Sequence, residues 1–161
     1  MKIIGLDCST KSTGFSVFND KELIDYGCLT ASSTDLIKRI NLIMSKIKDI
    51  LQKHPDTKTV IMEEVIPSTG KNIKTWKALI YLQAMIVIYL HNEFPQIKIE
   101  LIYPNSWRAK IGIHTGRSIT RDQLKNEDIN FVKQKYNIDV NDDIADAICI
   151  AHSLIFTGFV Q

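Results

Sequence analysis

The sequence is poor in cysteine and lacks any pattern that would tie the chain together covalently. Its 161 residues include three cysteines, Cys8, Cys28 and Cys149. An odd number without a close pair argues against a disulfide framework and against the paired thiols of a structural zinc site. We therefore expect reduced, partly buried thiols in a chain long enough to fold around its own hydrophobic core.

The sequence also lacks a long apolar run. Its most apolar stretch, residues 78–90, contains Gln83 and is shorter than the ~20 residues of a membrane span, which is typical of a buried helix. No N-terminal segment has the layout of a signal peptide. We expect a cytoplasmic protein without membrane contact. Length and the absence of repeats or linkers predict a single domain, 1–161.

A large excess of charge of one sign is missing as well. Twenty lysines and arginines face eighteen aspartates and glutamates, which gives a formal net charge of +2. Such a balance is weak support for a nucleic-acid partner, because bulk electrostatic attraction needs a clear excess of positive charge. Any binding of nucleic acid must therefore depend on where the basic residues gather.

What the chain does contain begins with a three-stranded unit. An apolar segment ends at Asp7, small turn-prone residues occupy 9–12, and a second apolar segment covers 15–18. This pattern is typical of a β-hairpin whose first strand carries a carboxylate at its end. Residues 21–29 predict a third, antiparallel strand.

Helices and strands alternate through the middle of the chain. Apolar residues recur at three- and four-residue steps over 36–51, which predicts an amphipathic helix with its N-cap within 31–34. Residues 59–65 predict a strand buried on both faces, and 97–103 predict another. A long helix over 72–91 separates them.

Helices also dominate the C-terminal part. A short helical turn is expected at 104–107, a helix over 120–136, and a last helix from Asn141 or Asp142. The whole order predicts an α/β fold with a five-stranded mixed sheet, its first three strands antiparallel, flanked by helices. The helix over 72–91 is apolar nearly all round and needs two surfaces to cover it, so we expect it to form a homodimer interface.

Acidic residues stand at the ends of three predicted elements. Asp7 ends the first strand, Glu63 and Glu64 end the fourth, and Asp143 and Asp146 lie one helical turn apart near the start of the last helix. Such acids, if they meet, repel one another unless they are protonated or bind metal. Oxygen ligands without paired cysteines or several histidines favour Mg²⁺ or Mn²⁺ over zinc.

Each acid also has an ordinary structural interpretation. Asp7 can begin an Asx turn, the two glutamates can form a solvated strand end, and Asp142 and Asp143 can complement the helix dipole. Asp146, one turn into an apolar helix, is harder to explain in this way. Their joint placement at element ends is the stronger signal, because two metal ions held by carboxylates can cleave phosphodiesters.

The residues around these acids resemble the motifs of the RuvC family of Holliday junction resolvases. The segment 5–14 is similar to the family's first motif, 61–65 to its second and 143–147 to its third, with the two aspartates three positions apart. The resemblance extends over essentially the whole chain and looks greatest to phage-encoded members.

The resemblance implies an RNase H-like fold, a homodimer, and paired Mg²⁺-dependent nicks across a four-way DNA junction. Carried over residue by residue, it implies that catalysis and metal binding belong to Asp7, Glu63, Asp143 and Asp146, with two Mg²⁺ ions per active site, for which Mn²⁺ can substitute. Glu63 matches the family's acid, and alternation along the strand points Glu64 to the other face.

Two positions depart from the family's pattern. Ser9 stands where cellular resolvases usually have glycine, and residues 66–69 lack the aromatic that the family can insert into the centre of a junction. Cleavage of other branched DNA, such as forks, is therefore also compatible with the sequence.

Two clusters of basic residues are candidates for DNA contact. The window 104–125 is the most basic in the chain, and a second cluster follows the fourth strand. The candidate DNA-binding residues are Lys71, Lys74, Lys77, Trp107, Arg108, Lys110, Arg117 and Arg121. An ordinary solvated surface stays the alternative for both clusters.

Three other functions compete with the resolvase hypothesis. An actin-like or sugar-kinase ATPase has a similar first loop, but it would need a second domain and a second phosphate loop, which we do not find in the sequence. An RNase H-like nuclease with another target, such as RNA or an RNA–DNA hybrid, is hard to separate by sequence. A non-catalytic nucleic-acid-binding module would retain its activity after loss of Asp7.

Overall fold

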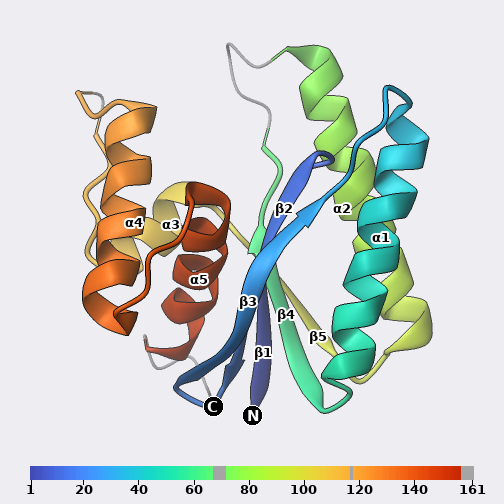
Figure 1. Cartoon of the computed structure of the whole chain (residues 1–161), viewed down its shortest axis with the longest axis horizontal. Coiled ribbons are helices and arrows are strands. Elements are labelled where there is room, and N and C mark those ends of the chain that lie inside the picture. The colour runs from blue at the N-terminus through green and yellow to red at the C-terminus, as the bar shows by residue number, and fades with distance from the viewer. Residues whose placement is uncertain (67–71, 117, 157–161) are drawn as a thin grey trace.

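The structure is a computed structural model that describes residues 1–66, 72–116 and 118–156. One five-stranded sheet lies between two groups of helices, as Figure 1 shows. The strands are β1 (Lys2–Asp7), β2 (Ser12–Asn19), β3 (Glu22–Thr30), β4 (Thr57–Glu63) and β5 (Lys98–Ile102). Their order across the sheet is β3-β2-β1-β4-β5.

The pairing of the strands confirms the predicted mixed sheet. The first three strands form an antiparallel meander, and β4 and β5 join it in parallel with β1. Because β1 and β4 are parallel, their C-terminal ends meet at one edge of the sheet. Asp7 and Glu63, the last residues of the two strands, are thereby brought to the same place.

The helices lie close to the predicted ranges. They are α1 (Leu36–Lys53), α2 (Ile73–Glu93), α3 (Pro104–Lys110), α4 (Arg121–Tyr136) and α5 (Asp142–Ile155). The expected N-cap within 31–34 is wrong. Asp35 caps α1 instead, since its carboxylate accepts a hydrogen bond of 2.9 Å from the backbone N–H of Lys38.

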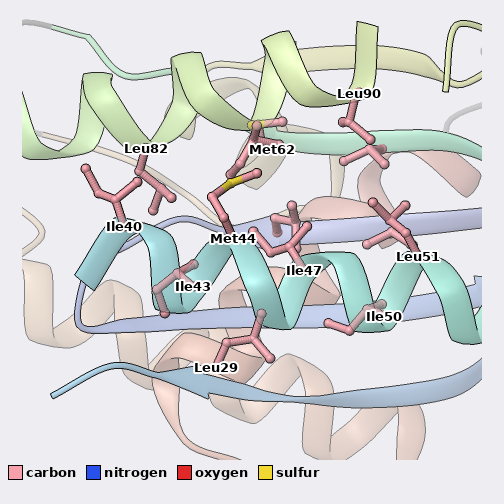
Figure 2. Close-up of a cluster of buried hydrophobic side chains, with 14 of the residues drawn as sticks. Leu29, Ile40, Ile43, Met44, Ile47, Ile50, Leu51, Met62, Leu82 and Leu90 are labelled. Carbon is pink, nitrogen blue, oxygen red and sulfur yellow. The ribbon is translucent and has the colours of Figure 1, made fainter. Parts of the chain in front are cut away.

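Two hydrophobic cores fill the two sides of the sheet. In the first, the apolar face of α1 and the leucines of α2 pack against strand residues such as Val60 and Met62 (Figure 2). In the second, α5 packs against Ile3, Phe18 and Ile61, with Trp107 and α4 behind it. Burial on both faces explains why β1 and β4 have nearly continuous apolar sequences.

Side-chain alternation selects which acids face α5. Ile61 packs in the α5 core, so Glu63, two residues further along β4, points to the same side. Asp7 likewise lies two residues beyond Gly5 in β1, and Gly5 faces α5, so Asp7 points to the α5 side of the sheet. Glu64 follows the end of β4, and its backbone N–H donates to the carbonyl of Ile102 over 2.8 Å.

Two glycines let α5 approach the sheet closely. A Cβ atom on Gly14 would lie 1.8 Å from the carbonyl oxygen of Asp143, and one on Gly5 would lie 2.4 Å from that of Ala147. The hydroxyl of Ser16 donates to the same Ala147 carbonyl over 2.8 Å. The close approach of Gly14 to Asp143 brings the first turn of α5 next to Asp7, because Gly14 pairs with Asp7 across the β1–β2 hairpin.

Helix α2 keeps one apolar face uncovered. Leu82, Ile86 and Leu90 are fully buried, whereas Tyr81 and Ile88 are 48% and 56% exposed. By length and composition alone α2 could cross a membrane, with a mean hydropathy of 1.3. Its leucine face packs in the first core, and its outer face is left without a covering surface within the described chain.

Candidate active site

The four predicted acids line one cleft, which we call the acid cleft. It has a volume of about 250 Å³ and lies where β1 and β4 end against the first turns of α4 and α5. Its lining residues are Asp7, Glu63, Pro104, Arg108, Arg121, Leu124, Lys125, Asp142, Asp143 and Asp146. Glu63 lines this cleft and Glu64 does not, although Glu64 lines an adjoining hollow together with Asp7 and Glu63.

Asp7 is the acid at the centre of this arrangement. Burial and the charges of Glu63 and Asp143 together raise its pKa to about 7, although the guanidinium of Arg108 opposes them. A carboxyl group in this setting resists ionisation until a cation compensates it. Asp7 therefore has the environment expected of a ligand for a positively charged partner.

Asp146 is held in a similar environment. Burial is the main cause that raises its pKa to about 9, and the charges of Asp7 and Asp128 add to it. Its Oδ1 atom is buried, and a side-chain hydrogen bond with Asp128 is a further cause of the raised pKa. A buried carboxyl group that shares a hydrogen bond with a second acid favours its protonated form unless a cation compensates the charge.

Helix α3 holds two of the acids in place. The indole Nε1 of Trp107 donates a hydrogen bond of 3.0 Å to Oε2 of Glu63. The next residue, Arg108, lies with its Nη2 atom 3.6 Å from Oδ2 of Asp146 and 2.8 Å from Oδ2 of Asp128. Two neighbouring residues of α3 therefore contact acids that come from β4 and from α5.

Asp143 is held in place by residues of β2 and β3. The Ser12 hydroxyl donates to its Oδ2 atom, and the Cys28 thiol lies 3.7 Å from the same oxygen. The neighbouring Asp142 instead pairs with Lys125, which holds the pKa of Asp142 below its usual range. Asp143 and Asp142 thus have different surroundings, although both begin α5.

The predicted DNA-binding residues lie in three kinds of surroundings. Lys74, Lys77, Lys110 and Arg121 are exposed, and Arg121 lines the acid cleft. Trp107 is fully buried and Arg108 is 8% exposed, so the structure does not support DNA contact by these two side chains. Lys71 and Arg117 lie outside the described residues.

Asp128 and Ser12 are site residues that the sequence analysis missed. Asp128 is fully buried and accepts two hydrogen bonds from Arg108, at 3.2 and 2.8 Å. Its spacing in α4, four residues from both Leu124 and Val132, places an acid on an apolar face. That was a usable signal, because a buried carboxylate needs a cationic partner. Nothing in the sequence around Ser12 indicated its partner Asp143.

The chemistry of the cleft fits a hard divalent cation. Its acids offer carboxylate oxygens, Asp7 is repelled by its acidic neighbours, and burial opposes the ionised form of Asp146 in the absence of a cation. The acids surround the cleft rather than form a closed cage. Among the described residues no three His, Cys, Asp or Glu side chains already stand at metal-ligand spacing.

Comparison with protein families gives one match that extends over nearly the whole chain. Residues 3–153 match the model of the family described as crossover junction endodeoxyribonuclease RuvC. The chain belongs to the RuvC family. Nucleases of this family act on Holliday junctions and depend on metal ions, which agrees with the acid cleft. No curated protein sequence matches the chain.

Solved structures of RuvC and of viral and mitochondrial resolvases have the same fold. Thermus thermophilus RuvC, in complex with a Holliday junction, is similar with a TM-score of 0.74 and 13% identity over 95% of this chain and 92% of that one. The fowlpox virus resolvase, also with Holliday junction DNA, gives 0.59 and 19% over 96% and 97%. A yeast mitochondrial resolvase gives 0.59 and 13% over 95% and 78%.

Proposed function

We propose that this RuvC-family protein resolves four-way DNA junctions by paired, Mg²⁺-dependent nicks, with Asp7, Glu63, Asp143 and Asp146 as its catalytic and metal-binding residues. The observation that carries the proposal is that these acids, from three elements distant in sequence, line one cleft. We also propose that the protein cuts other branched DNA, such as forks, and that it acts in the cytoplasm.

The four acids would hold two Mg²⁺ ions, and Mn²⁺ would substitute for them. Bound metal would supply Lewis-acid activation of water and neutralise charge on the phosphate. Trp107 and Ser12 keep Glu63 and Asp143 oriented through their hydrogen bonds. Arg108, tied to Asp128 and close to Asp146, limits the repulsion between acids from the wall of the cleft.

Arg121 is the basic residue best placed for the reacting phosphate. It is exposed, and it lines the acid cleft at the start of α4. Its guanidinium can donate two parallel hydrogen bonds to phosphate oxygens. Lys125 also lines the cleft, but it pairs with Asp142. We therefore assign phosphate contact to Arg121.

A homodimer supplies the second cut. Paired nicks need two acid clefts on one junction, and a symmetric dimer presents two identical clefts. The exposed apolar face of α2, with Tyr81, Met85 and Ile88, is the surface that we propose for this contact. The three residues recur at four- and three-residue steps and thus form one stripe.

Cleavage of labelled synthetic junctions tests the proposal. We expect symmetrical nicks with Mg²⁺, none with EDTA, and none from Asp7→Asn even when that variant still binds the junction. Asp49→Asn removes an exposed acid of α1 outside the cleft and serves as the matched control that should cut normally. Cutting by Asp7→Asn at the normal rate would contradict the proposal.

A panel of substrates separates this proposal from a nuclease with another target. Junction, fork, duplex, single strand and RNA–DNA hybrid are compared at equal concentration. We expect branched DNA to be cut fastest. Faster cleavage of the RNA–DNA hybrid would contradict the junction as substrate, although the same acids could still be catalytic.

A further inference from the structure

A second hollow, which we call the basic hollow, lies beside the hairpin turn that follows Asp7. It has a volume of about 320 Å³. Three cations line it, and they come from three elements: Lys11 from the β1–β2 turn, Arg39 from α1 and Lys74 from the first turn of α2. No acid is among its described lining residues. This contrasts with the acid cleft, where acids predominate.

The basic hollow is joined to the acid cleft through a connecting hollow. The connecting hollow shares Asp7, Glu63 and Pro104 with the acid cleft and shares Leu79 with the basic hollow. One turn of the chain lines all three. Asp7 faces the acid cleft, Cys8 the connecting hollow, and Lys11 the basic hollow. Four residues span at most about 14 Å, so the two ends are a few nucleotides apart.

The cations of the basic hollow are set in an ordered frame. Arg39 donates from Nη1 to the carbonyls of Ser33, at 2.7 Å, and of Thr34, at 3.2 Å. Its Nε atom is buried and has no partner among the described residues. The Ser9 carbonyl accepts a 2.6 Å hydrogen bond from the Thr13 hydroxyl, which fixes the turn that carries Lys11.

We propose that the basic hollow binds a backbone phosphate of the DNA strand whose scissile phosphate lies in the acid cleft. Lysine and arginine cations with neighbouring hydroxyls are the groups that contact DNA phosphates, and such contacts fix the register of a strand without reading its sequence. The inference rests on the proposed function and extends it. It assigns the strand a direction, from the ends of β1 and β4 toward the start of α2.

Salt dependence of junction binding tests the site. All proteins carry Asp7→Asn so that the DNA stays intact. Lys11→Gln and Lys74→Gln are compared with Lys58→Gln, which removes an exposed lysine at the opposite end of β4. A plot of the logarithm of the association constant against the logarithm of salt concentration has a negative slope. For each lost phosphate contact, this slope should become less steep by about 0.7–0.9. The Lys58 variant should keep the original slope.

A single uncharged methylphosphonate, moved along the strand on either side of the scissile position, locates the contact. We expect one position, a few nucleotides from the cut, to weaken binding by the protein with Lys74 intact. In Lys74→Gln the same methylphosphonate should have a smaller effect, because one of the cations that contact this phosphate is already lost. A folding defect cannot produce this position-specific result.

The outcomes separate this inference from the proposed function. Equal slopes for the Lys11, Lys74 and Lys58 variants, with normal junction cleavage in the presence of Asp7, would overturn the basic hollow alone. Failure of the unsubstituted chain to bind or cut any DNA would instead overturn the function on which the hollow depends.

Discussion

At the scale of single residues, the acid cleft holds carboxyl groups whose environment opposes their ionised form. Burial and neighbouring acids raise the pKa of Asp7 to about 7 and that of Asp146 to about 9. In the unfolded chain both would ionise near pH 4. The metal-free folded protein therefore binds more protons than the unfolded chain between these values, so its stability falls as pH rises through that window.

Asp146→Asn should therefore stabilise the metal-free protein while abolishing cleavage. We expect its melting temperature in EDTA to exceed that of the unsubstituted protein at pH 8. Each 1 kcal/mol of relief corresponds to about 2–4 °C at this chain length. The scan runs from pH 7 to 9, because His152, whose pKa burial lowers to about 4, is then neutral in the folded state. Added Mg²⁺ should stabilise the unsubstituted protein more than the variant.

A melting temperature of Asp146→Asn below that of the unsubstituted protein at pH 8 in EDTA would show that the charged carboxylate is already compensated by Arg108. Asp49→Asn, in α1 and outside the cleft, gives the baseline for a change from acid to amide.

Trp107→Phe isolates the hydrogen bond that orients Glu63. Phenylalanine keeps a smaller aromatic ring in the buried site, and the N–H that donates to Glu63 over 3.0 Å is lost. Removing such a partner of a metal ligand, the role that we propose for Glu63, typically reduces metal affinity or activity by about 10–100-fold. We expect a loss in this range for Mn²⁺ affinity, measured by calorimetry, with a smaller loss of thermal stability.

Trp76→Phe is the matched control for this change. The Nε1 atom of Trp76 is buried but has no hydrogen-bond partner among the described residues, so the same substitution removes no bond. Equal Mn²⁺ affinities for the Trp76 and Trp107 variants would show that Trp107 does not position Glu63 for metal binding.

At the scale of elements, the sequence was enough to predict the sheet and its helices. Apolar periodicity located α1 and α2, and the alternation along β4 separated Glu63 from Glu64, because both patterns reflect which face is buried. Contacts between elements were harder to predict. Trp107 and Arg108 were predicted to bind DNA, yet both are buried, since their partners Glu63 and Asp128 are distant in the sequence.

The contact between α5 and the hairpin predicts a strict requirement for glycine at position 14. In Gly14→Ala the added methyl group would lie 1.8 Å from the Asp143 carbonyl oxygen, so α5 must move away from β2. Overpacking of this kind typically costs about 1–3 kcal/mol. We expect a lower midpoint of urea unfolding, and loss of cleavage because Asp143 moves away from Asp7.

Gly116→Ala provides the comparison, because a Cβ atom there would meet nothing within 4 Å in the described structure. It should cleave junctions at the normal rate and unfold at the normal midpoint. Normal activity of Gly14→Ala would mean that the acid cleft does not depend on this close approach.

At the scale of the whole molecule, the proposed dimer contact through the outer face of α2 would let two acid clefts act together. A single chain leaves Ile88 56% exposed, in a stripe with Tyr81 and Met85. Burial of such side chains contributes about 25 cal/mol for each Å² of apolar surface removed from water. A glutamate in the stripe would have to lose its hydration at the interface, which is costly without a cationic partner.

Ile88→Glu should therefore convert the proposed dimer into a monomer, as measured by sedimentation equilibrium. Ile37→Glu makes the same change on α1, at an isoleucine that is 58% exposed, and should leave the assembly unchanged. The four acids come from one chain, so the monomer should still nick a junction, but the two nicks should become independent events. In a supercoiled plasmid with an extruded cruciform, nicked circles should then accumulate before linear product appears. If Ile88→Glu still sediments as a dimer and cuts both strands together, α2 is not the interface, and the two clefts must be paired through another surface.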